Sequence, residues 1–217
     1  METNGNLNAN EVVIPAGNRR LHGYLNLPAG ANAVVTFAHG SGSGRNSPRN
    51  QFVAEQLNKS GLATLLTDLL EDSEAEDRIN VFDVELLADR LLAAARWLRQ
   101  QSGTNNLPLG YFGASTGAAA ALSAAAQRTS WVRAIVSRGG RPDLAGDCVP
   151  DVQAPTLLIV GELDHVVVDL NRQALDLLTC TKELAIVPGA THLFPEPGSL
   201  EEVARLAGAW FLRYLRP

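Results

Sequence analysis

The amino-acid sequence predicts an α/β protein with a mostly parallel central sheet, helices on both faces of that sheet and no lid domain. Segments with strand character alternate with segments of helical spacing, as in sheets built from strand–helix–strand units. Most strand segments are continuously apolar, which is typical of strands buried on both faces. The chain has 217 residues, of which 46% are hydrophobic and 19% charged. This balance and length suit one domain with a full-sized core.

The strands are predicted from apolar runs bounded by turn residues. Residues 1–10 are polar and predict a loose tail, ahead of a single domain over residues 11–217. Two strand-like segments flank the turn at residues 16–18 and predict an antiparallel hairpin. Later strands are short apolar runs that end in glycine-rich or polar loops. The expected strands are residues 11–15, 20–28, 33–38, 62–67, 109–112, 132–137, 156–160 and 183–187.

The helices are predicted from apolar residues that recur at helical spacing. Residues 50–60 show this spacing and stop at Gly61, a common helix terminator. Residues 81–101 carry a long apolar stripe and predict one amphipathic helix, whereas residues 71–78 are interpreted as a charged connection. The expected helices are residues 50–60, 81–101, 116–128, 170–178 and 200–215.

Composition excludes several classes of function. The net charge is −5, without a cluster of Lys and Arg, so a nucleic-acid partner is not expected. Cys148 and Cys180 are too few for a disulfide framework and lie in no zinc-binding pattern, so neither a metal nor a cofactor is expected. The first ten residues lack the basic start and apolar run of a signal peptide, and no apolar run reaches the ~20 residues of a membrane span. We therefore expect a cytoplasmic protein without a membrane partner, either a monomer or a homodimer.

A candidate nucleophile lies between a predicted strand and a predicted helix. Residues 113–117 read Gly-Ala-Ser-Thr-Gly, which places Ser115 at a sharp strand-to-helix turn. Such a turn exposes the hydroxyl near a helix N-terminus, where free N–H groups favour a developing oxyanion. The structural alternative is that Ser115 only caps the helix.

A candidate acid and base follow later strands. Asp164 lies one turn past the strand at residues 156–160, where a carboxylate can reach an imidazole, with Glu162 and Asp169 as rival carboxylates. His192 lies on the last loop that can fold back over the nucleophile. The chain order Ser, Asp, His differs from that of the chymotrypsin and subtilisin types. Structurally, Asp164 could be a turn residue, and His192 could be bonded to a backbone carbonyl.

The oxyanion hole is assigned to two backbone N–H groups, those of Ser41 and Thr116. Residues 38–44 read Ala-His-Gly-Ser-Gly-Ser-Gly after the first buried strand, and glycines let such a loop approach a substrate closely. His39 is expected to brace this loop rather than transfer protons. A phosphate-binding loop is disfavoured, because the motif lysine of such loops is absent.

Two arginines at a strand end could bind the substrate. Arg138 and Arg141 lie on the loop after the strand at residues 132–137, and a guanidinium binds carboxylates well. The alternative is a structural ion pair with Asp143 or Asp147, or with the acidic segment at residues 71–77. Fewer than twenty residues separate this strand from the next, which is too short for a lid domain and predicts an open site for small esters.

These motifs together resemble the α/β-hydrolase superfamily, and within it the small dienelactone-hydrolase-like group. The similarity covers nearly the whole chain and rests on residues 39–40, 113–117, 161–164 and 189–192. It implies hydrolysis of an ester or related acyl bond without a cofactor. Dienelactone hydrolases proper carry a cysteine nucleophile, whereas this chain has Ser115. The resemblance therefore favours a general carboxylesterase that acts on small esters over a dienelactone-specific enzyme.

Other functions use the same residues or the same scaffold. A thioesterase, an acyltransferase or a perhydrolase would form the same acyl-enzyme on the serine. A non-catalytic binding protein could also be built on a hydrolase scaffold, because a fold does not fix a function. The complete Ser, Asp and His set argues against that last alternative.

Overall fold

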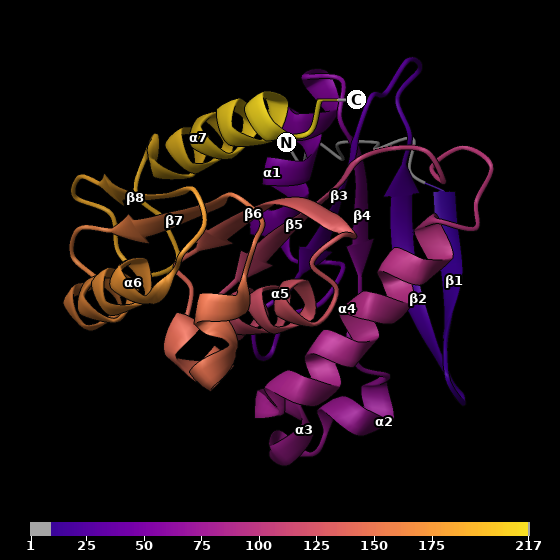
Figure 1. Cartoon of the computed structure of the whole chain (residues 1–217), viewed down its shortest axis with the longest axis horizontal. Helices are drawn as coiled ribbons and strands as arrows, with labels where there is room; N and C mark the ends of the chain where they lie inside the picture. Colours follow the sequence, from indigo (N-terminus) through magenta and orange to yellow (C-terminus); the bar gives the residue numbers. More distant parts are fainter. Residues whose placement is uncertain (1–9, 217) are drawn as a thin grey trace, which may run out of the picture.

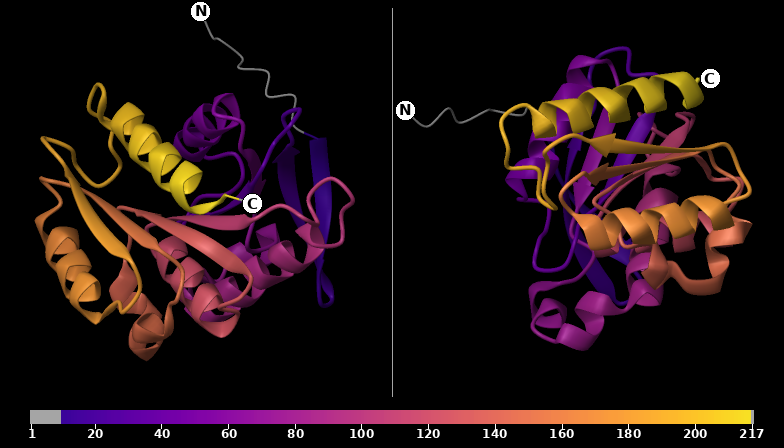
Figure 2. Two further views of the ribbon diagram at one scale, coloured as in Figure 1. Left: turned by 45° about the horizontal axis from the view of Figure 1, so that its top comes forward. Right: turned by 90° about the vertical axis from the view of Figure 1, so that its left-hand side faces the viewer.

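Eight strands form one sheet, in the order β1-β2-β4-β3-β5-β6-β7-β8. The computed structural model describes residues 10–216 (Figure 1). The pairs β1–β2 and β2–β4 are antiparallel, and all later neighbours are parallel. Figure 2 shows the β1–β2 hairpin at one edge of the sheet and β8 at the other. The strands are β1 (Asn10–Ala16), β2 (Arg19–Asn26), β3 (Val34–Ala38), β4 (Ala63–Thr67), β5 (Leu109–Ala114), β6 (Val132–Arg138), β7 (Thr156–Gly161) and β8 (Lys182–Val187).

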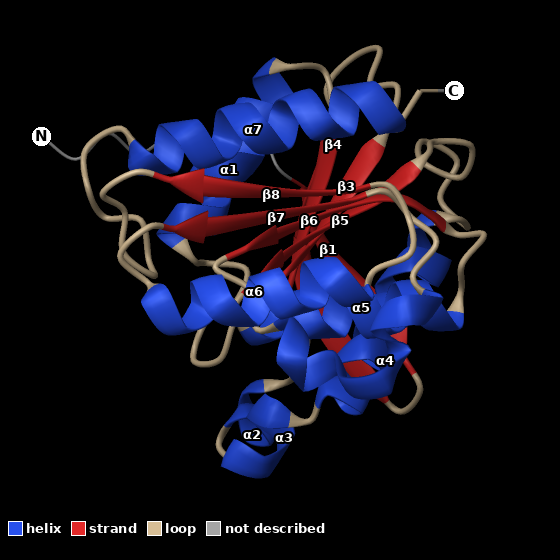
Figure 3. Ribbon diagram, turned by 60° about the vertical axis from the view of Figure 1, so that its left-hand side comes forward, coloured by secondary structure: helices blue, strands red, loops and turns tan. Residues whose placement is uncertain are grey.

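Helices cover both faces of the sheet (Figure 3). One face packs against α1 and α7, and the other against α4, α5 and α6, each through its own hydrophobic cluster. The short helices α2 and α3 project beyond the second layer. This is the predicted α/β-hydrolase fold. The helices are α1 (Pro48–Lys59), α2 (Asp72–Ala75), α3 (Arg78–Phe82), α4 (Val84–Leu98), α5 (Thr116–Gln127), the 3₁₀ helix η1 (Pro142–Asp151), α6 (His165–Leu177) and α7 (Ser199–Tyr214).

The strand order fixes where a site can form. From β3 the chain crosses to β4 on one side, and it then returns to place β5 on the other side of β3. A crevice opens at such a reversal, beyond the carboxyl ends of the two diverging strands. The loop after β3 and the turn after β5 therefore lie side by side. These are the two segments in which the sequence places Ser41 and Ser115.

Helix α5 is buried along almost its whole length because its side chains are small. Its sequence is TGAAAALSAAAQ, and residues 116–125 are all buried. Alanine has the highest helix propensity and a short side chain, so the helix forms readily and lies close to the sheet. The position of its first turn, which carries the candidate nucleophile, is thereby fixed.

The predicted helix at residues 81–101 is wrong in its first part. The chain breaks at Asp83, which ends α3 and caps α4 by accepting a hydrogen bond from the Leu86 N–H at 3.0 Å. The predicted connection at residues 71–78 also contains a helix, α2, whose first turn is closed by a reciprocal capping box between Glu71 and Glu74. Local side-chain-to-backbone bonds thus override the apolar pattern here.

Smaller differences lie at element ends. Helix α6 begins at His165, five residues before its predicted start. The three valines after His165 have low helix propensity, which argues against a helix in the sequence, but they do not prevent one from forming. Strand β1 begins at Asn10, which was assigned to the tail, and residues 1–9 of that tail lie outside the described residues. Among the described residues, no helix has the length and apolar character that a membrane crossing requires.

Candidate active site

Ser115 occupies a strained turn between β5 and α5. Its backbone angles are φ 51° and ψ −121°, and positive φ is rare for a residue with a side chain. Its side chain makes no capping bond to α5, so the hydroxyl is not used as a helix cap. The Ser115 N–H donates to the Arg138 carbonyl at 3.3 Å, and its own carbonyl accepts from the Arg141 N–H at 3.1 Å. The neighbouring strand therefore holds the turn in place.

Glycines allow the backbone to pack tightly around this turn. A Cβ atom added at Gly117 would lie 2.2 Å from the Ala38 carbonyl oxygen and 2.4 Å from that of His39. One added at Gly113 would lie 2.5 Å from the Ala118 Cα atom. Both distances are far below van der Waals contact. The loop after β3 thus presses directly against the first turn of α5.

Replacing Gly117 with alanine should lower the free energy of unfolding by about 3 kcal/mol, because backbone atoms on two segments must move apart. Urea unfolding of the variant would measure the loss. Gly208→Ala is the matched control: its Cβ atom would meet only Leu57, at 3.7 Å, within helix α7. That variant should gain stability, since alanine is the better helix former. Equal effects from the two substitutions would contradict the packing argument.

The candidate acid and base form a hydrogen-bonded pair. His192 Nδ1 lies 2.6 Å from Asp164 Oδ2, with the histidine 38% exposed and the aspartate 17% exposed. Asp164 stands at the N-cap position of α6 but makes no side-chain bond to that helix. Its carboxylate is instead directed at the imidazole. The loop after β7 and the loop after β8 meet through this contact.

The His192 ring lies next to the strand end that holds Ser115. A Cβ atom added at Gly139 would be 3.5 Å from both Cε1 and Nδ1 of the ring. Gly139 directly follows Arg138, whose carbonyl accepts from the Ser115 N–H. The Ser115 hydroxyl is not hydrogen-bonded to the ring in this structure, and such bonds often tighten only when substrate is in place.

The two rival carboxylates have other partners. Glu162 accepts a hydrogen bond from the Gly189 N–H at 2.8 Å and so ties the two loops together. Asp169 is exposed and pairs with Arg172 at 3.1 Å on the surface of α6. Neither contacts His192. Of the three carboxylates, Asp164 is the one that the structure brings to the imidazole.

The two candidate oxyanion donors lie beside the same cavity. Ser41 follows Gly40, whose added Cβ atom would lie 3.1 Å from the Ser115 Cβ atom. Thr116 is the first residue of α5, where helix N–H groups have no intrahelical acceptor. Within residues 10–216, neither the Ser41 nor the Thr116 N–H donates a hydrogen bond to another residue. Both donors are therefore available to a ligand.

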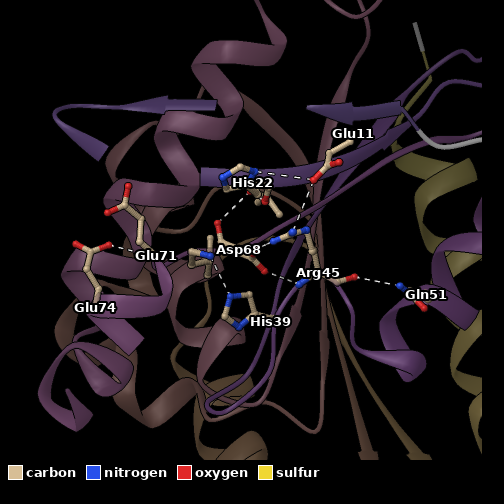
Figure 4. Close-up of polar contacts among 10 residues, drawn as sticks. Glu11, His22, His39, Arg45, Gln51, Asp68, Glu71 and Glu74 are labelled. Atoms are coloured by element: carbon tan, nitrogen blue, oxygen red, sulfur yellow. Dashed lines mark hydrogen bonds and ion pairs between the residues drawn. The ribbon is translucent and has the colours of Figure 1, made fainter. Parts of the chain in front are cut away.

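A polar network anchors the loop that carries Ser41 (Figure 4). His39 Nε2 accepts from the Leu69 N–H at 3.0 Å, and its Nδ1 lies 3.0 Å from the Gly40 carbonyl, so the ring is neutral with the proton on Nδ1. Asp68 accepts from the Arg45 N–H at 2.7 Å and forms an ion pair with the Arg45 guanidinium. The loop after β3 is thus tied at both ends to the segment that follows β4.

Of this network, the sequence predicted only the bracing role of His39. Asp68 was missed, although it directly follows the apolar strand β4. A search for carboxylates one residue past each buried strand would have found it. Its partner Arg45 carried no such signal, because the contact depends on how two loops approach each other.

The buried ring of His39 should make stability depend on pH. Burial is the main cause that lowers its pKa from the ordinary 6.5, against opposing effects of the Gly40 carbonyl and Asp68. Below pH 6.5, His39 therefore binds a proton in the unfolded chain more readily than in the folded chain. The contribution of the neutral His39 ring to the free energy of unfolding is fully present above pH 6.5. It is lost as the pH falls toward the lower pKa that His39 has in the folded chain.

We expect the free energy of unfolding to fall between about pH 7 and pH 5, and to fall less in a His39→Gln variant. Urea unfolding at several pH values would measure both slopes. His165→Gln is a suitable control, since this histidine is exposed. An unchanged slope in His39→Gln would show that His39 is not the group responsible.

A cavity of about 640 Å³ opens beside Ser41 and Thr116. Its volume is in the usual range for small-molecule sites. One wall is formed by residues 39–49, which are the loop after β3 and the start of α1, and the other includes Leu70, Val81 and Leu87. Helices α2 and α3, which the sequence did not predict, contribute to the second wall. Among the described residues, no group of three or more His, Cys, Asp or Glu side chains could hold a metal.

The two candidate substrate-binding arginines differ in their surroundings. Arg141 pairs with Asp143 through two hydrogen bonds of 2.8 and 2.7 Å, which is the structural alternative weighed for it. Arg138 is only 4% exposed and has no carboxylate partner among the described residues. Its guanidinium lies 5.9 Å from the ring centre of Phe194, two residues after the candidate base.

Most of the chain matches the model of one known protein family. The model of the dienelactone hydrolase family matches residues 21–210. The chain belongs to the dienelactone hydrolase family. It is accordingly a hydrolase with the α/β-hydrolase fold, as the motifs in its sequence predicted.

Solved structures support the same fold. A dienelactone hydrolase from Anabaena variabilis is 53% identical and has a TM-score of 0.93, with 96% of this chain and 98% of that chain covered. Est1E from Butyrivibrio proteoclasticus has a TM-score of 0.80 at 17% identity, covering 94% and 98% of the two chains. The esterase domain of a Rhodothermus marinus protein has a TM-score of 0.77 at 21% identity, covering 95% and 99%. At such low identity, the last two show the fold alone.

Two related proteins carry a name that does not refer to a hydrolase. Proteins from two strains of Mycobacterium tuberculosis, each named as a phosphoribosyl transferase, are 56% identical to this chain over 205 residues. The match covers 94% of this chain but 46% of theirs. The chain thus spans about half the length of the curated relatives it matches.

Proposed function

We propose that this hydrolase is a serine carboxylesterase that cleaves small esters through an acyl-enzyme on Ser115. The observation that carries the proposal is the 2.6 Å bond between Asp164 and His192, formed next to the strained turn of Ser115. Three loops that follow separate strands carry Ser115, Asp164 and His192 at one edge of the sheet. No cofactor is needed for this chemistry.

The proposed cycle has two half-reactions, and in each of them His192 first accepts a proton and then gives it up. His192 accepts the hydroxyl proton as Ser115 Oγ attacks the carbonyl carbon. Asp164 holds the imidazole in the required tautomer and stabilises its charged form. The N–H groups of Ser41 and Thr116 bind the tetrahedral oxyanion, and loss of one such donor typically costs ~3 kcal/mol in the transition state. His192 then gives the proton to the departing alcohol, and a water molecule, activated in the same way, releases the acid.

The test is a burst experiment with p-nitrophenyl acetate and p-nitrophenyl butyrate on the wild type and on Ser115→Ala. A fluorophosphonate that reacts with activated serines serves as the label. Turnover and labelling that both vanish in the variant would support the acyl-enzyme. A folded wild type with neither turnover nor labelling would reject the esterase and favour the non-catalytic binding protein.

A thioesterase, an acyltransferase or a perhydrolase would pass through the same acyl-enzyme. These activities differ only in the leaving group or in the acceptor that attacks the intermediate. Thioester substrates, added alcohols and hydrogen peroxide, tested on the unlabelled wild-type enzyme, would separate them. The cytoplasmic location and the monomeric or homodimeric state predicted from the sequence remain part of this proposal.

We also infer that the transferase name of the mycobacterial relatives belongs to their unmatched half. The matched half is the part that the dienelactone hydrolase family model covers in this chain. This chain should therefore not consume phosphoribosyl pyrophosphate under conditions in which it cleaves p-nitrophenyl acetate. Consumption of that compound by the purified chain would overturn the inference.

A further inference from the structure

Two arginines beside the candidate active site lack a negatively charged partner. Arg138 ends β6 and is 4% exposed, while Arg49 lies in the first turn of α1. Burial, with a smaller effect from the like charge of Arg49, lowers the pKa of Arg138 to about 10. Two cations thus lie near each other in an enclosed region.

Other enclosed arginines of this chain are neutralised by acids. Arg45 pairs with Asp68, and Arg90 pairs with Glu74 at 2.8 Å. Within the described part of the chain, neither Arg49 nor Arg138 has a carboxylate within ion-pair distance. A buried charge without a partner is strongly unfavourable, so an exception at a strand end next to Ser115 calls for an explanation.

One donor of each arginine is buried and unsatisfied. The Nε atoms of both arginines are buried and have no hydrogen-bond acceptor among the described residues, which is also true of Arg45 and Arg90, but those two have carboxylate partners at their Nη atoms. The one side-chain bond that Arg138 makes runs from Nη2 to Asn50 Oδ1, at 3.3 Å. Asn50 is the third residue of α1, so the buried guanidinium points at the first turn of that helix. Buried donors without acceptors are rare in folded proteins.

One arginine of the pair, Arg49, lines the cavity beside the two candidate oxyanion donors. Arg138 does not reach the wall of this cavity. The cavity also includes Ser47 and Pro48, which begin α1, and helix N-termini favour anions. Arg49 can therefore contact a ligand in the cavity. Arg138 lies outside the cavity wall and adds a second positive charge near Arg49.

We propose that Arg49 and Arg138 form an anion subsite that binds a phosphate group of the substrate. Two uncompensated positive charges match a dianion, whereas a carboxylate would leave one of them without a partner. The planar guanidinium also suits phosphate oxygens. The substrate is then a small ester that carries a phosphate in its acyl or alcohol part. The position of the scissile bond rests on the proposed esterase function, but anion binding does not.

Binding is tested first with inorganic phosphate, on Ser115→Ala so that no chemistry intervenes. Calorimetry at constant ionic strength should detect phosphate binding and much weaker binding of acetate. Arg49→Gln should weaken phosphate binding about tenfold or more, which corresponds to one charge-assisted contact. Arg138→Gln should weaken it as well. Arg133→Gln, an exposed arginine on the same strand, should leave it unchanged.

Catalysis is tested with three p-nitrophenyl esters whose acyl chains end in a phosphonate, a carboxylate or a methyl group. We expect kcat/KM to be highest for the phosphonate, and Arg49→Gln to remove that preference while the neutral ester is still cleaved. No phosphate binding, a preference for the carboxylate, or binding unchanged in Arg49→Gln would overturn the subsite. Phosphate binding that depends on Arg49, without turnover of any ester, would reject the esterase but support the subsite.

Discussion

Ser115→Ala should lower kcat for p-nitrophenyl acetate by about 10⁴-fold or more, because it removes the atom that forms the acyl-enzyme. The fold should survive, since the Ser115 side chain makes no bond to α5 and its backbone bonds remain. Steady-state and burst kinetics would measure the loss, with thermal unfolding as the check on folding. Residual turnover near the wild-type rate would show that another residue is the nucleophile.

Ser115→Gly should show how much backbone strain the positive φ of residue 115 adds, independently of the loss of the hydroxyl. It removes the same hydroxyl, but glycine adopts positive φ without strain. Relief of strain of about 1–3 kcal/mol exceeds the added entropy of the unfolded chain, so we expect this variant to be about 1 kcal/mol more stable than Ser115→Ala. Urea unfolding of the two variants gives the difference. Equal stability would mean that the strain in this turn is no larger than the entropy that glycine adds to the unfolded chain.

Asp164→Asn should lower kcat by about 10⁴-fold, as expected when an amide replaces the carboxylate that fixes a catalytic imidazole. Asparagine has nearly the shape of aspartate, so His192 should keep its position beside residue 164. The amide, however, no longer fixes the tautomer of the imidazole or stabilises its charged form. The kcat of the folded variant is the measurement. KM should change much less than kcat.

The neighbouring carboxylates provide controls for Asp164. Asp169→Asn should have no effect on kcat, because its side chain is exposed and pairs with Arg172. Glu162→Gln should cost far less than Asp164→Asn, since its bond goes to the Gly189 N–H and not to the imidazole. A loss in Glu162→Gln as large as that in Asp164→Asn would mean that the acid has been assigned wrongly.

The sequence predicted the sheet and the positions of Ser115, Asp164 and His192 because each lies in a loop that follows a predicted strand. Parallel strands bring their carboxyl ends to one edge, so residues at those ends can meet without any knowledge of packing. The proposed roles of these residues still await the kinetic tests above. Within the Ser41 loop, spacing and glycine content were enough to indicate close approach.

Features that depend on contacts between loops were not predictable. The pairing of Asp68 with Arg45 requires the loop after β3 to fold back onto the segment after β4. The split of the long helix at Asp83 depends on one capping bond that outweighs a continuous apolar stripe. The missing acid partner of Arg138 is a property of the assembled structure, since the sequence offers several acidic residues within reach of its loop.

The short connection between β6 and β7 has a kinetic consequence. It holds residues 139–155, all of them described, and contains only the short 3₁₀ segment η1, kinked at Gly146, without an inserted cap over the cavity. Slow closing and reopening of such a cap limits turnover in many enzymes. For the proposed esterase, no such step precedes the chemistry, so turnover should be insensitive to solvent viscosity. Solvent water should also reach the acyl-enzyme throughout its lifetime, which favours release of the free acid over transfer to a dilute alcohol.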